Sequence, residues 1–439
     1  MMRSLFSGVS GLRIHQTKMD VIANNVSNVN TVGYKSSRVT FNEVFNQTLS
    51  GASGPNEARQ RGGINPMQVG LGSGVASIDK LMTTGAAQRT DNPLDLMIQG
   101  DGFFVVGDIT GQYFTRAGNF VEDERGHLTQ NGLKLLGWDT VWDNAVKDFV
   151  IQRMTVRPLQ ITPEKEYLNP SATTQVNIIG NINPNTDRVV HRSMSFYDSV
   201  GTQYTMDVDL EFIRSITAES EWRVSFPTPA IYPNGDRSRP HAVTQIPSFP
   251  IAFNTDGRLL SVDGNNTLVS RAIAIGPTTP LAPAATIGGT AGTVTGLINI
   301  DFSGLNQFVN ENTNAMADNR DGNAPGRLVG LNVGSDGKIT GRYSNGLVRL
   351  LGQIPLAMFK NPAGLEKMGN NLFTGTPNSG SFDGVGTVGV VQGGVLEMSN
   401  VDLSQEFTEM ITTQRGFQAN SRIITTTDTM LQELVNLVR

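Results

Sequence analysis

The chain has 439 residues, with 34 Lys and Arg against 39 Asp and Glu, and a net charge of −5. This length allows several domains with their own cores. The slightly acidic balance, without a long basic run, argues against binding to nucleic acid or to an anionic membrane surface. The absence of cysteine excludes disulfides, thiolate catalysis and cysteine metal sites. No apolar run reaches the roughly 18 residues of a membrane span, so we expect no membrane insertion.

The first predicted element is a helix from residue 3 to about 30, part of an N-terminal segment 1–32. Its apolar residues recur at steps of three and four, which places them on one face. A stricter seven-residue repeat is typical of helices that wind around partner helices. That repeat consists of Leu5, Leu12, Met19 and Val26.

Residues 33–75 differ in character, with Gly- and Pro-containing stretches at 51–55 and 61–66. A connection this long is usually functional or disordered. We therefore expect a linker that becomes ordered only against neighbouring molecules.

Short strands are predicted over residues 76–170, where apolar and polar residues alternate. The turn Gly100–Gly102 is expected to join the strand around 94–98 to the strand 103–106 as a hairpin. Asn131–Gly132 has the composition of a tight hairpin turn. Short strands with Gly-rich turns return at 326–398, so we expect 76–170 and 326–398 to form one discontinuous β domain.

Residues 171–325 carry longer apolar strands and are expected to form a second, outer β domain inserted into the first. The clearest predicted strands are 176–179, 205–210 and 222–226. The Pro-rich stretch 278–285 is expected to be a surface loop.

The last predicted element is a helix from about 402 to 437 within a C-terminal segment 399–439, with Asp402 or Ser404 as its cap. It repeats the seven-residue pattern at Leu403, Met410, Phe417, Ile424, Leu431 and Val438. The predicted fold is thus mainly β with long terminal α-helices. The expected architecture is nested: a coiled-coil-like helix pair, a discontinuous β domain and an inserted outer β domain.

These helices predict assembly. Burial of each large apolar side chain contributes roughly 1.5–3 kcal/mol, but a single pair of helices covers only part of each stripe. The ordinary alternative is an antiparallel pair that caps a monomeric β protein. The strict seven-residue period and the Gly-rich linker favour neighbouring subunits as the missing cover.

Residues suited to catalysis or metal binding are not brought together by the sequence. His15, His127, His191 and His241 lack metal-ligand spacing. Residues 318–322 faintly resemble a calcium loop without its distal Glu. Asp207 and Asp209 share a strand face but have no recognisable acid/base partner. We expect no enzyme activity, cofactor or metal.

Three motifs, in order, span nearly the whole chain: residues 10–12 with 19–35, residues 92–105, and residues 396–403 with 414–422. Together they resemble the signatures of the bacterial flagellar rod and hook proteins. In that family the shorter members form the rod, and longer members with an inserted outer β domain form the hook. The predicted insertion places this chain with the hook members.

The resemblance implies a structural subunit of a curved extracellular tube, a homopolymer that encloses a channel and passes motor torque to the filament as a universal joint. The implied partners are other copies of the chain, the rod, hook-cap and hook–filament junction proteins, and the flagellar type III export apparatus. The N-terminus lacks the apolar core of a cleaved secretory signal, which fits such export.

Within this family, early export substrates carry a Phe-x-x-x-apolar motif, and Phe41 with Phe45 fits it. Two alternatives stay open. One is the distal rod protein, which should not need residues 171–325. The other is a secreted, monomeric β-rich hydrolase or adhesin with a helical stalk, which should show a pocket with converging polar groups.

Overall fold

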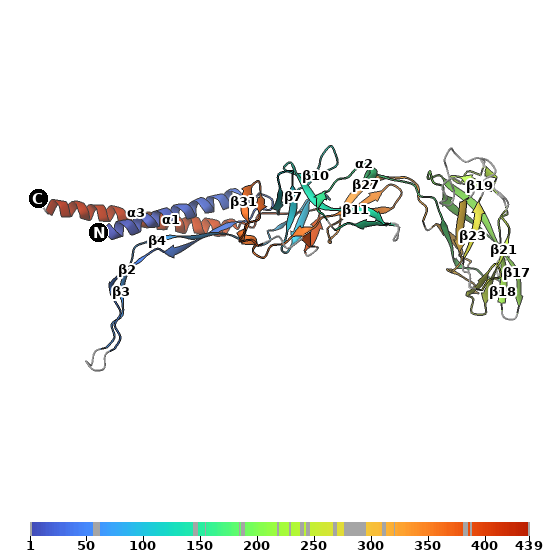
Figure 1. Cartoon of the computed structure of the whole chain (residues 1–439), viewed down its shortest axis with the longest axis horizontal. Helices are drawn as coiled ribbons and strands as arrows, with labels where there is room; N and C mark the ends of the chain where they lie inside the picture. The colour runs from blue at the N-terminus through green and yellow to red at the C-terminus, as the bar shows by residue number, and fades with distance from the viewer. Residues whose placement is uncertain are drawn as a thin grey trace. The chain divides into compact units, whose positions relative to one another are not determined.

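The structure, a computed structural model, begins and ends in a long helix (Figure 1). Helix α1 is Met2–Ser27 and helix α3 is Leu403–Leu437. The terminal helices predicted from the sequence are confirmed, and the rest of the described chain is mainly β. The residues that the structure describes are 2–55, 62–143, 148–153, 155–183, 185, 189–216, 219–227, 230–237, 241–242, 246–266, 270–275, 296–309, 313–319, 321–380, 385–386 and 389–437.

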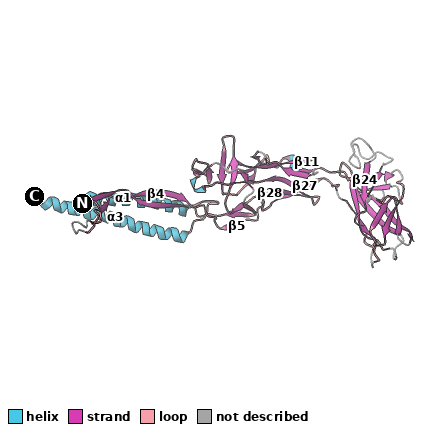
Figure 2. Ribbon diagram, turned by 60° about the horizontal axis from the view of Figure 1, so that its bottom comes forward, coloured by secondary structure: helices cyan, strands magenta, loops and turns pink. Residues whose placement is uncertain are grey.

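The two helices lie side by side and run antiparallel (Figures 1 and 2). Lys18 of α1 pairs with Glu409 of α3, whereas Gly8, earlier in α1, lies against Ile424, later in α3. At the start of α3, the Asp402 carboxylate accepts a hydrogen bond from the backbone N–H of Ser404 at 2.8 Å. Asp402 is therefore the N-cap.

Two short strand pairs follow α1. Strand β1 (Ser37–Glu43) pairs antiparallel with β4 (Ser73–Lys80), and both contact α1. Strand β2 (Asn46–Ser50) pairs antiparallel with β3 (Met67–Gly70). The described part of the stretch that the sequence assigns to a linker thus contains paired strands. Its ordering by neighbouring molecules stays a prediction.

The β part of the first compact unit packs on a core of Phe103, Val105, Phe114, Leu136, Ala357, Leu365 and Phe373. Asn131 and Gly132 have positive φ angles and join β10 to β11, which confirms that predicted turn. The strands are β5 (Ala87–Arg89), β6 (Leu96–Gln99), β7 (Phe103–Gly107), β8 (Gln112–Thr115), β9 (Val121–Glu122), β10 (Leu128–Gln130), β11 (Leu133–Asp143), β12 (Asp148–Ile151), β13 (Arg157–Pro158), β30 (Leu356–Ala357), β31 (Glu366–Gly369), β32 (Leu372–Thr374), β33 (Val385–Gly386), β34 (Val390–Gly393) and β35 (Val395–Glu397), with a 3-10 turn at Pro362–Gly364.

The hairpin predicted at Gly100–Gly102 is wrong. Strand β6 pairs with β34 near the C-terminal helix, and β7 pairs with β8, β11 and β30 instead. Every residue of β7 is buried, so it is a central strand with partners on both edges. The alternation of apolar residues located both strands, but β6 pairs with a strand almost 300 residues later, and β7 pairs with the strand that follows it and not with β6.

Apart from β14, which pairs with β27, the strands of the second compact unit from β15 to β26 form two sheets over a shared apolar core that includes Ile178, Trp222 and Ile300. The predicted strands 176–179 and 205–210 lie within β15 and β17, and β18 covers 222–225 of the third. The Pro-rich stretch 278–285 lies outside the described residues. The elements are α2 (Pro163–Glu166), β14 (Tyr167–Leu168), β15 (Gln175–Asn181), β16 (Val189–Tyr197), β17 (Gln203–Ile216), β18 (Glu219–Ser225), β19 (Ala230–Pro233), β20 (His241–Ala242), β21 (Phe249–Asn254), β22 (Leu259–Val262), β23 (Ser270–Ile275), β24 (Gly296–Asp301), β25 (Leu305–Asn306) and β26 (Met316–Asn319).

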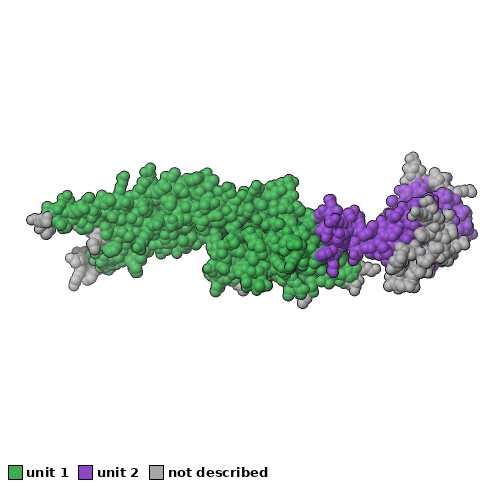
Figure 3. Space-filling model, turned by 90° about the horizontal axis from the view of Figure 1, so that it is seen from above, with its two compact units in different colours: residues 1–162, 331–341, 349–439 green, residues 163–330, 342–348 purple. Residues whose placement is uncertain are grey.

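The two compact units are coloured separately in Figure 3. Unit 1 comprises residues 1–162, 331–341 and 349–439, and unit 2 comprises residues 163–330 and 342–348. Three strands contain the later unit boundaries: β27 (Gly326–Val333), β28 (Lys338–Tyr343) and β29 (Val348–Gln353). The predicted nesting, with its insertion at 171–325, stays a prediction.

Candidate assembly site at the paired helices and their junction

Small residues let α1 and α3 approach closely. A Cβ added to Gly8 would lie 3.2 Å from Ile424 Cγ1, and one added to Gly416 would lie 2.7 Å from the Nε2 atom of His15. The buried side chains along this seam include Ile14 and Ile22 of α1. On α3 they are Thr413 and Thr427, so the dry seam contains few large apolar groups.

The predicted seven-residue stripe lies largely beside this dry seam. Leu403 and Phe417 are exposed, at 39% and 42% of their surfaces, and Val438 lies outside the described residues. The other stripe residues are half-buried: Leu5, Leu12, Met19, Val26, Met410, Ile424 and Leu431. None of the nine described stripe residues is fully covered in the single chain.

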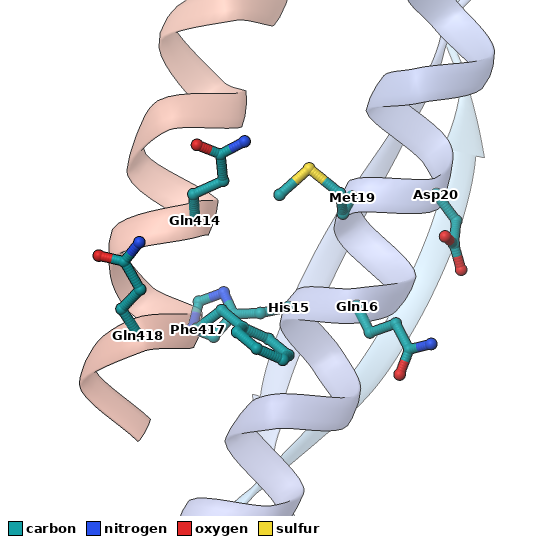
Figure 4. Close-up of a pocket in the computed structure, with 7 residues that line it drawn as sticks. All are labelled: His15, Gln16, Met19, Asp20, Gln414, Phe417 and Gln418. Atoms are coloured by element: carbon teal, nitrogen blue, oxygen red, sulfur yellow. The ribbon is translucent and has the colours of Figure 1, made fainter. Parts of the chain in front are cut away.

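One groove brings two stripe residues together. It has a volume of about 410 Å³ and runs between the helices, with Met19 on one wall and Phe417 on the other. Figure 4 shows the Met19 side chain pointing toward α3, whereas Gln16 and Asp20 point away from it. The groove therefore has an apolar floor and a polar rim, and it is open to solvent.

His15 lies where this groove meets the first strand pair. Its ring contacts the Phe41 ring edge-on, with centroids 6.1 Å apart. Burial lowers the pKa of His15 from 6.5, and the nearby Lys18 ammonium lowers it further. Protonation of this ring is thus unfavourable in the folded helix pair.

A buried charge cluster joins the helical segments to the β part of unit 1. Lys35 Nζ donates to Glu397 Oε1 at 2.6 Å and to the Thr83 carbonyl at 2.7 Å. Arg116 Nη1 lies 3.5 Å from Glu397 Oε2, and its guanidinium stacks over Phe103. All three charged side chains are almost completely buried. One carboxylate thus holds two cations from separate segments.

Burial also controls the protonation of this cluster. It lowers the pKa of the Lys35 ammonium, and the adjacent Glu397 carboxylate partly offsets the effect. Burial likewise lowers the pKa of Arg116, against the raising influence of Glu397 and then Asp101. Glu397 is therefore the group that makes burial of both cations tolerable.

Asn25 fastens α1 to both neighbouring segments. Its side-chain amide donates to Ser37 O and to Glu406 Oε1, each at 2.8 Å, and its oxygen accepts from Ser37 N. The Tyr34 hydroxyl donates to the same oxygen at 3.3 Å. Burial raises the pKa of Glu406, and the hydrogen bond from Asn25 opposes this shift. The Asn25 amide thus stabilises the charged form of a partly buried carboxylate.

The backbone at the junction is tight. Gly33 has φ +68° and donates its N–H to the Glu397 carbonyl at 2.8 Å. A Cβ there would lie 2.6 Å from Ala117 N, so this position requires glycine on two counts. Asn400 closes the other side: it accepts from Ser36 N at 2.8 Å and donates to Leu81 O at 2.9 Å.

No repeat or spacing in the sequence singles out these junction residues. Asn25, Gly33 and Lys35 lie inside one quoted motif, and Glu397 and Asn400 lie inside another, more than 360 residues away. The one hint in the sequence is that charged and amide residues stand next to apolar residues inside both motifs. Only folding shows that the two motifs meet.

Of the two export-motif residues, Phe41 contacts His15 at the edge of this site. Phe41 is in β1, and Phe45 follows its end with 72% of its surface exposed. No described residue between 37 and 50 is helical, so this motif lies in strand and loop.

Asp209 has a partner that the sequence did not reveal. His191 Nδ1 lies 2.7 Å from Asp209 Oδ1, across strands β16 and β17 of unit 2. Ser193 lines the same shallow hollow of about 430 Å³. In the structure His191 hydrogen-bonds the aspartate and not Ser193, and 75% of its side chain is exposed. This arrangement lacks the nucleophile–base contact of a hydrolase.

The weak calcium-loop candidate has a structural role instead. Asp321 Oδ1 accepts hydrogen bonds from the backbone N–H groups of Thr174 and Gln175. Among the described residues, no group of three His, Cys, Asp or Glu side chains is placed to hold a metal. In the same part of the chain no helix is long and apolar enough to cross a membrane.

Four family models match the chain. They are the "flagella basal body rod protein" over residues 5–35, the "flagellar hook protein FlgE/F/G D1 domain" over 97–178, the "flagellar basal body protein FlaE D2 domain" over 167–322, and the "flagellar basal body rod FlgEFG protein C-terminal" over 392–437. Together they include the helices, the junction segments and much of unit 2.

Full-length relatives give the same result. The chain is 36% identical to the flagellar hook protein FlgE of Borreliella burgdorferi and 38% identical to that of Treponema pallidum, with all of both chains covered in each comparison. The flagellar basal-body rod protein FlgG of Bacillus subtilis is 29% identical, again over both full lengths. The crystal structure of the Helicobacter pylori flagellar hook protein FlgE2 shares the fold, with a TM-score of 0.50, 14% identity, and coverage of 71% of this chain and all of that one. At these identities over whole chains, the protein belongs to the family of flagellar hook proteins FlgE.

Proposed function

We propose that this chain is the structural subunit of a flagellar hook, a curved tubular homopolymer that passes motor torque to the filament as a universal joint. The observation that carries the proposal is its similarity over the whole chain to hook proteins. The half-covered helix pair supports it, because such a pair gains apolar cover when copies assemble.

The surface that mediates this assembly is, in our proposal, the seven-residue stripe on both helices. Its described members keep apolar area open to solvent, and Phe417 and Met19 flank a groove that a neighbouring side chain can enter. Val438 completes the stripe in the sequence. The paired helices would line the central channel, with the β domains outside.

The junction connects the helix pair to the β part of unit 1 through buried charges. Lys35, Glu397 and Arg116 tie the segments after α1 and before α3 to the β part of unit 1. A buried cluster centred on the hydrogen-bonded Lys35–Glu397 ion pair resists displacement more than a solvent-exposed linker does. We infer that torque passes through this cluster between the inner helices and the outer β structure.

The further partners in this proposal are the rod, hook-cap and hook–filament junction proteins, and the type III export apparatus. Phe41 and Phe45 are the proposed export-gate residues, supported by their spacing and by the exposure of both rings. The location is the extracellular hook. In this proposal the chain acts without enzymatic activity or cofactor.

A distal rod subunit is the second candidate, favoured by the similarity to the Bacillus subtilis rod protein. The hook proteins of the two spirochaetes are more similar to this chain, at 36% and 38% identity against 29%. Tube shape separates the candidates: a hook subunit gives curved tubes and a rod subunit gives straight ones.

Electron microscopy of the purified full-length chain tests the proposal. We expect tubes from the wild type and none after deletion of residues 403–439, with the β-sheet signal in circular dichroism retained. Phe417→Asp should also abolish tubes, because it places a charge on the proposed contact. Ala419→Asp is the matched control, at an exposed position of α3 that does not line the groove. Tubes from the deletion variant would overturn the role of the helices.

A further inference from the structure

A two-stranded ribbon in unit 1 has one apolar face and one polar face. We define the ribbon as β2 and β3 with the flanking Phe45 and Leu71. Gln47 pairs with Val69, and Ser50 pairs with Met67 across a bulge at Leu49. Paired residues on antiparallel strands point to the same side. The mainly apolar face therefore carries Phe45, Leu49, Met67, Val69 and Leu71, with the polar Gln47 beside Val69, and the opposite face carries Asn46, Thr48 and Gln68.

No described part of the chain covers this apolar face. All five of its apolar residues are exposed. An isolated two-stranded ribbon is marginally stable at best in water. Its amphipathic pattern therefore predicts a partner that packs against one face only.

The apolar surface continues into a groove beside α1. The groove has a volume of about 570 Å³ and is lined by apolar side chains from the helix and from the base of the ribbon. Leu71 belongs to both the ribbon face and the groove. The apolar lining residues are Phe6, Val9, Ile14, Val44, Leu71 and Val75.

A second unpartnered apolar surface lies at the end of α3. Met430, Leu434 and Leu437 follow at steps of four and three, so they share one helix face, and Leu437 is 84% exposed. The antiparallel contacts place Gly8 of α1 against Ile424. Figure 1 shows α3 continuing past the start of α1, so the last turns of α3 extend beyond their intramolecular partner.

We propose that the end of α3 from a second copy of the chain docks on the apolar face of the ribbon and in the adjoining groove. The proposal rests on the proposed function as a self-assembling subunit. The dimensions fit: eight helical residues from 430 to 437 span about 12 Å, and the five residues of β2 span about 16 Å.

Charge supports this choice of occupant. Exposed Arg13 lines the groove, and exposed Arg3 lies near the start of the same helix. The end of α3 carries the exposed acids Asp428 and Glu433. The two arginines at the groove attract the two acids of the helix end and favour a register that keeps these acids away from Glu43, which lies against Gly70 of the ribbon.

The end of α3 that docks and the ribbon face that receives it are different surfaces of the same molecule. Such a heterologous contact does not pair two copies and stop; it continues from copy to copy, as in rings and helical tubes. The ribbon contact therefore gives a polymer, whereas a self-complementary ribbon would give a closed dimer.

The cysteine-free sequence allows a direct test by cross-linking. Full-length Leu434→Cys and Val69→Cys chains, one of them carrying a mass tag, are mixed, assembled into tubes and treated with a short bismaleimide. We expect mixed dimers on a denaturing gel. The matched control pairs Leu434→Cys with Gln68→Cys, on the polar face, and should give roughly tenfold fewer.

Equal yields from Val69→Cys and Gln68→Cys, cross-linking of the ribbon only to itself, or tubes without mixed dimers would each overturn the proposal while leaving the proposed function intact. A wild-type chain that forms no tubes would overturn both. In a second measurement, Val69→Asp should raise the protein concentration needed for tubes by roughly tenfold or more, and Gln68→Asp should leave it nearly unchanged. Equal effects of the two aspartates would count against the docking site.

Discussion

Unit 2 and the helix pair bury their apolar residues in opposite ways. Trp222, Val208 and Ile300 belong to a large core in unit 2 in which most side chains are completely inaccessible. Along the helices, by contrast, the dry seam consists mainly of glycine, threonine and a few apolar groups. Unit 2 buries its large apolar side chains within the chain. The helix pair buries only part of its apolar surface, and the rest is exposed and can contact other copies.

The largest expected effect on the isolated chain is in unit 2. The Trp222 ring is fully buried and packs edge-on against Phe212 at 5.3 Å. Trp222→Ala should lower the unfolding free energy of unit 2 by about 3–5 kcal/mol, because it leaves a cavity. Chemical denaturation followed by circular dichroism in the β-sheet band measures the change. On the helices, Ile411→Ala removes an exposed side chain and should change the unfolding free energy of unit 1 by less than about 0.5 kcal/mol. Equal losses from the two substitutions would contradict the difference in burial between unit 2 and the helix pair.

The junction should behave like the core although it is polar. Glu397→Gln removes the charge that two buried cations share, and should cost about 3–5 kcal/mol of unfolding free energy. Glu409→Gln, at the more exposed pair with Lys18, should cost less than about 1 kcal/mol. Adding Lys35→Met to Glu397→Gln should recover part of the loss. A Glu397→Gln variant as stable as the wild type would mean that the cluster does not hold the junction.

Gly33 tests how tightly the junction is built. Gly33→Ala should destabilise unit 1 by about 2 kcal/mol or more, since the added Cβ meets the Ala117 backbone and the φ angle disfavours alanine. Gly132→Ala is the control, because Gly132 also has positive φ but has open space around it. It should cost only about 1 kcal/mol. Thermal unfolding of the two variants separates close packing from backbone conformation.

The sequence predicted the elements better than their partners. The terminal helices and many strands followed from periodicity, because the pattern of burial along one element is a local property. The partner of β6 did not, since β34 lies almost 300 residues later and no local signal specifies it. The same limit applies to the junction: Lys35 and Glu397 are 362 residues apart. The stripe residues were found because they recur every seven residues, whereas Asn25 and Gly33 belong to no repeat that would mark them.

The smallest expected effect concerns pH and the helix pair. The folded-state pKa of His15 lies below its ordinary value of 6.5, so the unfolded chain binds a proton first as the pH falls. The stability contributed by neutral His15 is present above pH 6.5 and is lost as the pH falls through that value toward the folded pKa. Circular dichroism in the helix band during thermal unfolding, at several pH values, measures this loss.

Other groups on the helices titrate nearby, so the decisive quantity is the difference between the wild type and His15→Gln. The raised pKa of Glu406 acts in the opposite direction, because its protonation in acid relieves a buried charge, and it is present in both proteins. The difference between them should therefore isolate the histidine, and His191→Gln, in unit 2, should leave the helix signal unchanged. If His15→Gln kept the full pH dependence of the wild type, burial of the ring between α1, α3 and Phe41 would not control helix pairing.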